Sequence, residues 1–272
     1  MVYINYYYMS TTFQSTKTPR KPLHIIIDER ISKEDREIVR NTLEDLLGRF
    51  EGWANVSIER YYFYEPWCEN PDQPYCRPQY YIETCRGFNS MVNVDCILNL
   101  SSNEPWQTIN PHYDIYIIKD LIYRDLIYNG IIYNGIALTA GSTLQAILPD
   151  GQINPDFAGS VLSIGALREL YGVEWELAFF ISAAHELGHL FGLPNPNSPY
   201  YINYNHPYAK ENRSYVNHCS YEYCTMRQTN IETGPYIDLL DLAKNILRYN
   251  PYYLYCKDDW EYLIRNLKRL FG

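Results

Sequence analysis

The chain has 272 residues, of which 46% are hydrophobic, and its formal net charge is −9. This length suits one large domain or two small ones, and the hydrophobic content excludes an intrinsically disordered chain. The negative charge gives no electrostatic support for a role in nucleic-acid binding.

The sequence carries no pattern of membrane insertion or secretion. No continuous apolar run reaches the roughly 20 residues that a membrane-spanning helix needs. The first ten residues, Met-Val-Tyr-Ile-Asn-Tyr-Tyr-Tyr-Met-Ser, lack the basic start and long apolar core of a signal peptide. We therefore expect a cytoplasmic protein that has neither a membrane nor a nucleic acid as its partner.

The N-terminal part predicts a strand, a helix and a second strand. Residues 1–20 are polar and are expected to form a flexible arm. The β-branched run at 23–28 predicts a buried strand, and Ser32 opens a capping box whose helix keeps apolar spacing until Gly52. Residues 53–64 alternate as a second strand does. Two strands joined by a helix are expected to lie parallel, with the helix behind their sheet.

Residues 65–92 predict a loop-rich, cysteine-rich insertion. Four cysteines crowd into this part of the chain and the residues just after it: Cys68, Cys76, Cys85 and Cys96. Their spacing fits no familiar zinc pattern, so we favour two disulfides, with a metal-binding knot as the alternative. Ordinary cytosol keeps thiols reduced, although intracellular proteins of hyperthermophiles are an exception.

The middle of the chain predicts three further strands. They are expected at 95–100, at 113–119 and at 160–164. Between 121 and 150 the sequence Tyr-Asn-Gly occurs twice, at Tyr128 and at Tyr133, and either copy suits a hairpin turn.

A helix from Trp175 to Phe191 is the central element of the prediction. It is apolar on nearly every face, as a helix through the middle of a domain is, and Gly192 suits its left-handed C-cap. Within it, His185 and His189 stand four residues apart and project from one face, which suits two imidazoles binding one Zn²⁺. Glu186 between them is placed to take a proton from zinc-bound water and to return it to a leaving amine.

A catalytic zinc site needs a third protein ligand. The long motif His-Glu-x-x-His-x-x-Gly-x-x-His would place it at position 195, where this chain has Asn195. Further on, the chain reads His218-Cys-Ser-Tyr-Glu-Tyr-Cys-Thr-Met226. Here the sequence resembles the archaemetzincins, whose signature joins the long motif directly to Cys-x4-Cys-x-Met. The resemblance implies that 195–217 is an insertion and that His218 is the third ligand, with His206 and His112 as the alternatives.

The same resemblance implies further roles. Met226 corresponds to the methionine of the turn beneath the metal, although it also suits an ordinary core position. In the family a second, structural zinc is held by Cys-x4-Cys and a later Cys-x-x-Cys pair. Cys219 and Cys224 match the first pair, but only Cys256 remains of the second. A second zinc and a disulfide among these three thiols are both open.

The predicted fold is α+β and metzincin-like: a mixed twisted sheet with a backing helix, a central active-site helix and a smaller helical C-terminal lobe. The N-terminal lobe is expected to span 21–192. The C-terminal lobe, 193–272, would contain the insertion, the third ligand, the methionine turn and two amphipathic helices at 236–249 and 258–271.

The resemblance implies a zinc-dependent metallopeptidase that acts on a peptide or protein substrate. Zn²⁺ is its expected cofactor, held by His185, His189 and His218, and Glu186 activates the zinc-bound water. The strand at 160–164, which precedes the metal helix as in the family, is expected to be an antiparallel edge strand that pairs with the substrate. The alternative is a non-catalytic protein in which zinc stabilises a binding surface.

Overall fold

A computed structural model describes the chain over residues 22–63, 78–103, 107, 111–128, 131–139, 141–143, 159–211, 216–228 and 238–272. The predicted N-terminal arm, Cys68 and Cys76 lie outside these residues. The α-helices are α1 (Lys33–Ala54), α2 (Pro78–Thr84), α3 (Val94–Ser102), α5 (Ile164–Tyr171), α6 (Trp175–Leu190), α7 (Pro207–Glu211), α8 (Leu239–Tyr249) and α9 (Lys257–Phe271). The strands are β1 (Leu23–Ile27), β2 (Arg60–Phe63), β3 (Val92–Asn93), β4 (Tyr113–Ile118), β5 (Ile122–Tyr128), β6 (Ile131–Thr139), β7 (Gly141–Thr143), β8 (Gly159–Ser163), β9 (Tyr201–Ile202) and β10 (His218–Cys219).

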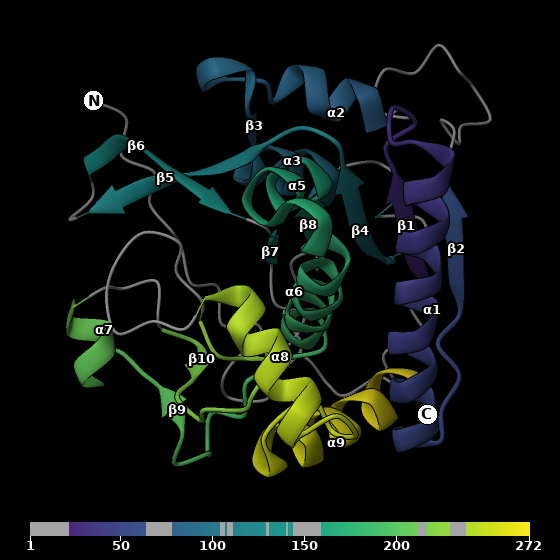
Figure 1. Cartoon of the computed structure of the whole chain (residues 1–272), viewed down its shortest axis with the longest axis vertical. Coiled ribbons are helices and arrows are strands. Elements are labelled where there is room, and N and C mark those ends of the chain that lie inside the picture. Colours follow the sequence, from purple (N-terminus) through teal and green to yellow (C-terminus); the bar gives the residue numbers. More distant parts are fainter. Residues whose placement is uncertain are drawn as a thin grey trace.

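The main sheet has five strands in the order β2-β1-β4-β8-β7. The first four are parallel, and β7 pairs antiparallel with β8 at one edge. The sheet is therefore mixed, with α1 covering β1 and β2 and α6 running through the middle of the molecule (Figure 1). These features, together with the C-terminal helices α8 and α9, confirm the predicted mixed α+β fold class.

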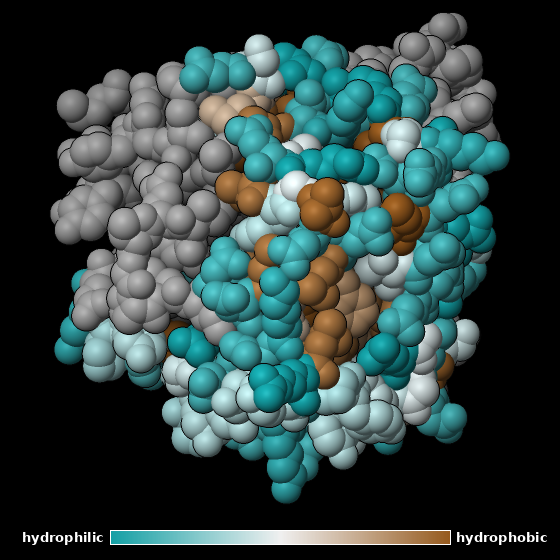
Figure 2. Space-filling model, viewed as in Figure 1, coloured by the Kyte–Doolittle hydropathy of each residue, from teal (hydrophilic) through white to brown (hydrophobic). Residues whose placement is uncertain are grey.

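Each face of the sheet has its own apolar core. Side chains alternate along a strand, so Ile115 and Ile117 of β4 pack with α1, α6, α8 and α9, whereas Tyr116 and Ile118 pack with α2 and α3. On the face drawn in Figure 2, the coloured residues are largely hydrophilic, and hydrophobic residues show mainly near the middle of the view, where α5 and α6 lie. Within the described ranges, no helix combines the length and hydropathy needed to cross a bilayer.

The C-terminal part lies in the lower half of the view in Figure 1. It contains α8 and α9, and α9 packs against α1 while α8 packs against α6. The residues predicted as a loop insertion contain two short elements, β9 and α7, and β9 pairs antiparallel with β10. The insertion is thus joined by backbone hydrogen bonds to the segment that contains His218.

Three predicted elements were wrong in extent or type. The first helix continues past Gly52 to Ala54, because Asn55 in the left-handed conformation caps it and donates its N–H to Glu51. The predicted second strand, 53–64, is accordingly shorter in the structure, where it is β2 (Arg60–Phe63). The residues predicted as a strand at 95–100 belong to α3, whose N-cap Asn93 accepts a hydrogen bond from the Cys96 N–H. A short apolar run does not distinguish a buried strand from a helix.

The strand at 160–164 was placed wrongly at the sheet edge. It is present as β8, but it lies between β4 and β7 and runs parallel to β4. The antiparallel edge strand is β7, which the sequence did not reveal because three residues carry no readable periodicity. The hairpin expected near Tyr128 is formed by β5 and β6, in which Tyr128 pairs with Ile131.

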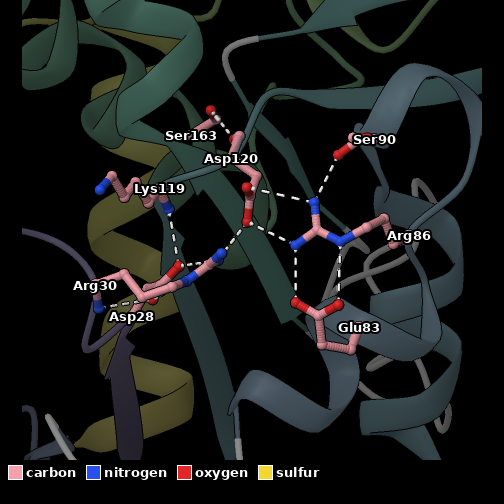
Figure 3. Close-up of polar contacts among 8 residues, drawn as sticks. All are labelled: Asp28, Arg30, Glu83, Arg86, Ser90, Lys119, Asp120 and Ser163. Atoms are coloured by element: carbon pink, nitrogen blue, oxygen red, sulfur yellow. Dashed lines mark hydrogen bonds and ion pairs between the residues drawn. The ribbon is translucent and has the colours of Figure 1, made fainter.

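A network of charged groups ties the loops together at the carboxyl ends of β1 and β4 (Figure 3). Asp28 is fully buried and accepts hydrogen bonds from the Arg30 side chain, at 2.6 and 3.0 Å, and from the Lys119 N–H. Asp120 pairs with both Arg30 and Arg86. The hydrogen bonds from Arg30 to Asp28 raise the pKa of the guanidinium above its ordinary value.

We expect Asp28→Ala to lower the free energy of unfolding by about 3 kcal/mol, because it leaves the Lys119 N–H and the Arg30 guanidinium without their buried acceptor. The matched control is Asp45→Ala, which breaks the exposed Asp45–Arg49 pair and should cost no more than about 0.5 kcal/mol. Urea unfolding followed by circular dichroism measures both. Equal losses in the two variants would contradict a structural role for the network.

Candidate metal centre

Helix α6 carries the two histidines of the His-Glu-x-x-His motif through the interior. Their ring centroids lie 4.7 Å apart, as expected for side chains one helical turn apart on one face. Gly192, one residue beyond the C-cap Phe191, has φ 91°, the left-handed conformation that suits glycine at a helix end. The predicted helix, its end and the pairing of His185 with His189 are therefore all present.

His218 joins these two histidines from another part of the chain. Its ring centroid lies 5.2 Å from that of His185 and 5.1 Å from that of His189. One candidate ligand atom from each of the three residues lies within 4.8 Å of the others. The alternatives lie elsewhere: His206 contacts Tyr208, and His112 stacks on His24. The structure thus brings His218, rather than either alternative, to the histidine pair.

Backbone carbonyls fix the orientation of all three rings. The Nδ1 atoms of His185, His189 and His218 lie 2.7, 3.0 and 3.0 Å from the carbonyl oxygens of Thr225, Leu193 and Val216, respectively. Because a carbonyl oxygen only accepts, Nδ1 carries the proton in each ring, and Nε2 of the neutral ring presents a lone pair. Metal-binding histidines have this arrangement.

The donor set fits a divalent cation. The Nε2 atoms of His185 and His189 are 3.1 Å apart, so in the neutral rings two lone pairs face each other at short range. A cation between them turns this repulsion into attraction. Burial lowers the pKa of His185, although its hydrogen bond to Thr225 works in the opposite direction, and the neutral ring is the form that binds metal. Three imidazoles suit Zn²⁺.

Glu186 is buried beside β7, the edge strand. The Thr143 hydroxyl donates a hydrogen bond to the Glu186 carboxylate and lies 3.0 Å from Ser160 Oγ on β8. A Cβ added to Gly141 would come within 2.9 Å of three side-chain atoms of Glu186, so glycine is needed for this close approach. The sequence did not indicate Gly141 or Thr143, because only the sheet pairing brings them to the helix.

Met226 and Tyr255 pack against the segment of α6 that carries the histidine motif. Met226 is fully buried, and its sulfur would lie 2.5 Å from a Cβ added to Gly188, within the His-Glu-x-x-His motif. The Tyr255 hydroxyl donates a hydrogen bond to the Ala184 carbonyl at 2.6 Å. Met226 thus packs directly beneath the histidine-bearing turn, at the place expected of the methionine turn.

A second cluster gathers Cys219, Cys224, Cys256 and Asp259, all of them buried and with one candidate ligand atom each within 4.8 Å of the others. The three thiols are free, and the sulfurs of Cys219 and Cys256 are 3.8 Å apart. The sequence pattern did not indicate Asp259, because that pattern consists of thiols alone. It occupies the last position of Cys256-Lys-Asp-Asp259.

The electrostatics of this cluster also suit a cation. Burial, and then the neighbouring Cys256, raise the pKa of Asp259 to about 7, and burial raises the pKa of Cys224. Groups that repel one another's negative charge in this way can all ionise once a divalent cation is bound.

Of the four cysteines nearer the N-terminus, Cys85 and Cys96 form a disulfide.

Comparison with known proteins gave matches among solved structures alone. No protein-family model and no curated protein matches the chain. The archaemetzincin of Methanopyrus kandleri aligns with 91% of this chain and 96% of its own, at 14% identity and a TM-score of 0.48. The archaemetzincin of Archaeoglobus fulgidus, in complex with malonate, aligns with 81% of this chain and 90% of its own, at 18% identity and a TM-score of 0.40. Both alignments cover most of the chain at low sequence identity.

Proposed function

We propose that the protein is a zinc-dependent metallopeptidase that hydrolyses peptide bonds. His185, His189 and His218 would hold the catalytic Zn²⁺, and Glu186 would act as general base and then as general acid. The observation that carries the proposal is that one ring nitrogen from each of the three histidines lies within 4.8 Å of the others, while each Nδ1 is held by a backbone carbonyl. Three fixed imidazole donors beside a carboxylate are the composition of a hydrolytic zinc site.

The protein's own groups account for the proton transfers of this reaction. Bound Zn²⁺ supplies a Lewis acid that polarises a carbonyl group and lowers the pKa of water toward about 7. Glu186 takes the proton of the attacking water and passes it to the nitrogen of the leaving amine. The hydrogen bond from Thr143 keeps the carboxylate oriented, so that Glu186 does not swing away between the two transfers.

The edge strand β7 provides a surface for an extended substrate. Among the strands that the structure describes, it is the outermost of the five-stranded sheet, and its residues Gly141 and Thr143 contact the proposed general base. A peptide that adds to such an edge gains backbone hydrogen bonds, and its scissile amide is held next to the catalytic carboxylate. We therefore assign to β7 the substrate-pairing role that the sequence had suggested for residues 160–164.

We further propose that Cys219, Cys224, Cys256 and Asp259 bind a second, structural Zn²⁺. The cluster supplies four buried ligands, the number that a closed structural site requires. Cys219 belongs to β10 beside His218, whereas Cys256 caps α9 and Asp259 lies in its first turn. A metal here would tie the C-terminal helix to the segment that contributes the third catalytic ligand.

Metal removal tests the catalytic proposal. Chelation of the purified protein should lower hydrolysis of a peptide library at least about 100-fold, and added Zn²⁺ should restore it, because the histidines alone supply no Lewis acid. Mass spectrometry of the products measures hydrolysis, and elemental analysis measures the zinc content of the protein. The apo protein incubated with Mg²⁺ serves as the control. Absence of hydrolysis by fully zinc-loaded protein would contradict the peptidase proposal and favour a zinc-stabilised binding protein.

A further inference from the structure

A third group of potential metal ligands lies at the amino-terminal ends of β1 and β4. His24 and Asp114 are paired across the two strands, and His112 immediately precedes β4. All three side chains are buried, and one candidate ligand atom from each lies within 4.8 Å of the others. The group is built from none of the residues of the two clusters described above.

The Asp114 carboxylate is the most informative member. Its Oδ2 accepts a hydrogen bond of 2.7 Å from the Ser101 hydroxyl, which itself accepts one from Tyr116 at 2.8 Å. Its Oδ1 is buried and has no hydrogen-bond partner. A buried carboxylate oxygen without a partner destabilises the folded state, because it has lost its hydrogen bonds to water and gained none in return. Such an atom needs a ligand that the described residues do not provide.

Two imidazoles face that oxygen without forming a hydrogen bond to it. His112 Nε2 lies 3.3 Å and His24 Nδ1 lies 3.8 Å from Asp114 Oδ1. Donor atoms around a tetrahedral zinc ion, each about 2.1 Å from it, are separated by roughly 3.4 Å. The observed spacings are therefore close to those of ligands that share one ion, and too long or too poorly directed for a hydrogen bond.

His24 is also suited to binding in its neutral form. Burial, and then the proximity of His112, lower the pKa of His24 to about 4, so its ring is uncharged at neutral pH. The two rings stack with centroids 3.9 Å apart, and Phe63 packs edge-on against His24 at 5.1 Å. Within the described part of the chain, no Lys or Arg side chain lies within 4 Å of the Asp114 carboxylate to balance its charge.

We propose that His24, His112 and Asp114 form a binding site for a divalent transition-metal ion of the Zn²⁺ class. Two imidazoles and one carboxylate match the donor preference of such ions. Ser101 and Tyr116 orient the carboxylate through its other oxygen, as partners of metal-binding carboxylates do. The bound ion would join β1, β4 and the end of α3 on the face of the sheet opposite α6, which makes it a structural site.

Histidine NMR tests the proposal on the unmodified protein. The chain has six histidines, of which five lie in the two histidine-containing clusters and His206 lies in neither. In protein labelled with ¹⁵N-histidine, loading the chelated form with Zn²⁺ should shift the ring nitrogens of five residues and leave those of His206 unchanged. Shifts confined to His185, His189 and His218 would overturn the proposal while leaving the catalytic site intact.

Metal stoichiometry of variants provides the second test. His24→Phe keeps an aromatic ring in the stack and removes the donor atom, and Asp114→Asn keeps an acceptor for Ser101. Each should bind one equivalent of Zn²⁺ less than the wild type, and the double variant should lose no more than one. His206→Ala is the matched control and should bind the wild-type amount. Wild-type stoichiometry in either cluster variant, with wild-type circular dichroism, would overturn the proposal.

Discussion

Glu186→Gln should lower kcat for peptide hydrolysis by about 10³-fold while zinc stays bound. The amide has nearly the shape of the carboxylate, and its oxygen can still accept the hydrogen bond from Thr143. What it loses is the ability to take up a proton from water. Because Glu186 is not one of the three proposed zinc ligands, the zinc content of the protein should not change. Steady-state kinetics and elemental analysis of the same preparation measure both quantities.

Glu176→Gln is the matched control for this substitution. Glu176 lies on the same helix, in its first turn, and is exposed, so the same chemical change there should leave kcat within about twofold of the wild type. Activity of Glu186→Gln within tenfold of the wild type would show that Glu186 is not the general base. Loss of zinc from this variant would instead assign the carboxylate to the metal site.

The sequence predicted the parts of the centre that lie on one helix. The spacing of His185 and His189 specifies a shared face only if the segment is helical, and the apolar residues around them made that prediction reliable. His218 followed from its neighbours, Cys219 and Cys224, and not from its distance along the chain. Its position now has a physical basis, since β10 pairs with β9 inside the insertion and Val216 orients its ring.

The contacts that the sequence did not predict have two causes. Some depend on how the strands pair in the sheet, and one involves a carboxylate ligand in a cluster that otherwise consists of thiols. Thr143 reaches Glu186 because β7 pairs with β8 beside α6, which requires the whole sheet to be known. The paired positions of His24 and Asp114 likewise follow from strand register. The sequence pattern indicated three thiols and no fourth ligand, because Asp259 is not a cysteine.

Because one of its four candidate ligands is the carboxylate of Asp259, the second cluster can be used to test how zinc binding depends on the type of ligand. Its Oδ1 accepts a hydrogen bond from the Asn195 N–H at 2.7 Å, and its Oδ2 lies 3.2 Å from the Cys224 sulfur. The carboxylate therefore already connects α9 to the residues that follow the histidine helix. A metal on the same carboxylate would strengthen this connection, because ligand bonds contribute directly to the free energy of folding.

Asp259→Asn should remove one equivalent of zinc and lower the Tm by about 10 °C or more, because a neutral amide is a poor zinc ligand and leaves three thiolates in a site that needs four ligands. The neighbouring Asp258→Asn keeps an acceptor for Ser198 and should change neither quantity by much. Asp259→Cys should bind zinc fully, since four thiolates also make a closed tetrahedral site. Elemental analysis and differential scanning calorimetry measure these effects. If Asp259→Asn retains all its zinc, or if Asp259→Cys loses it, the fourth ligand is not at position 259.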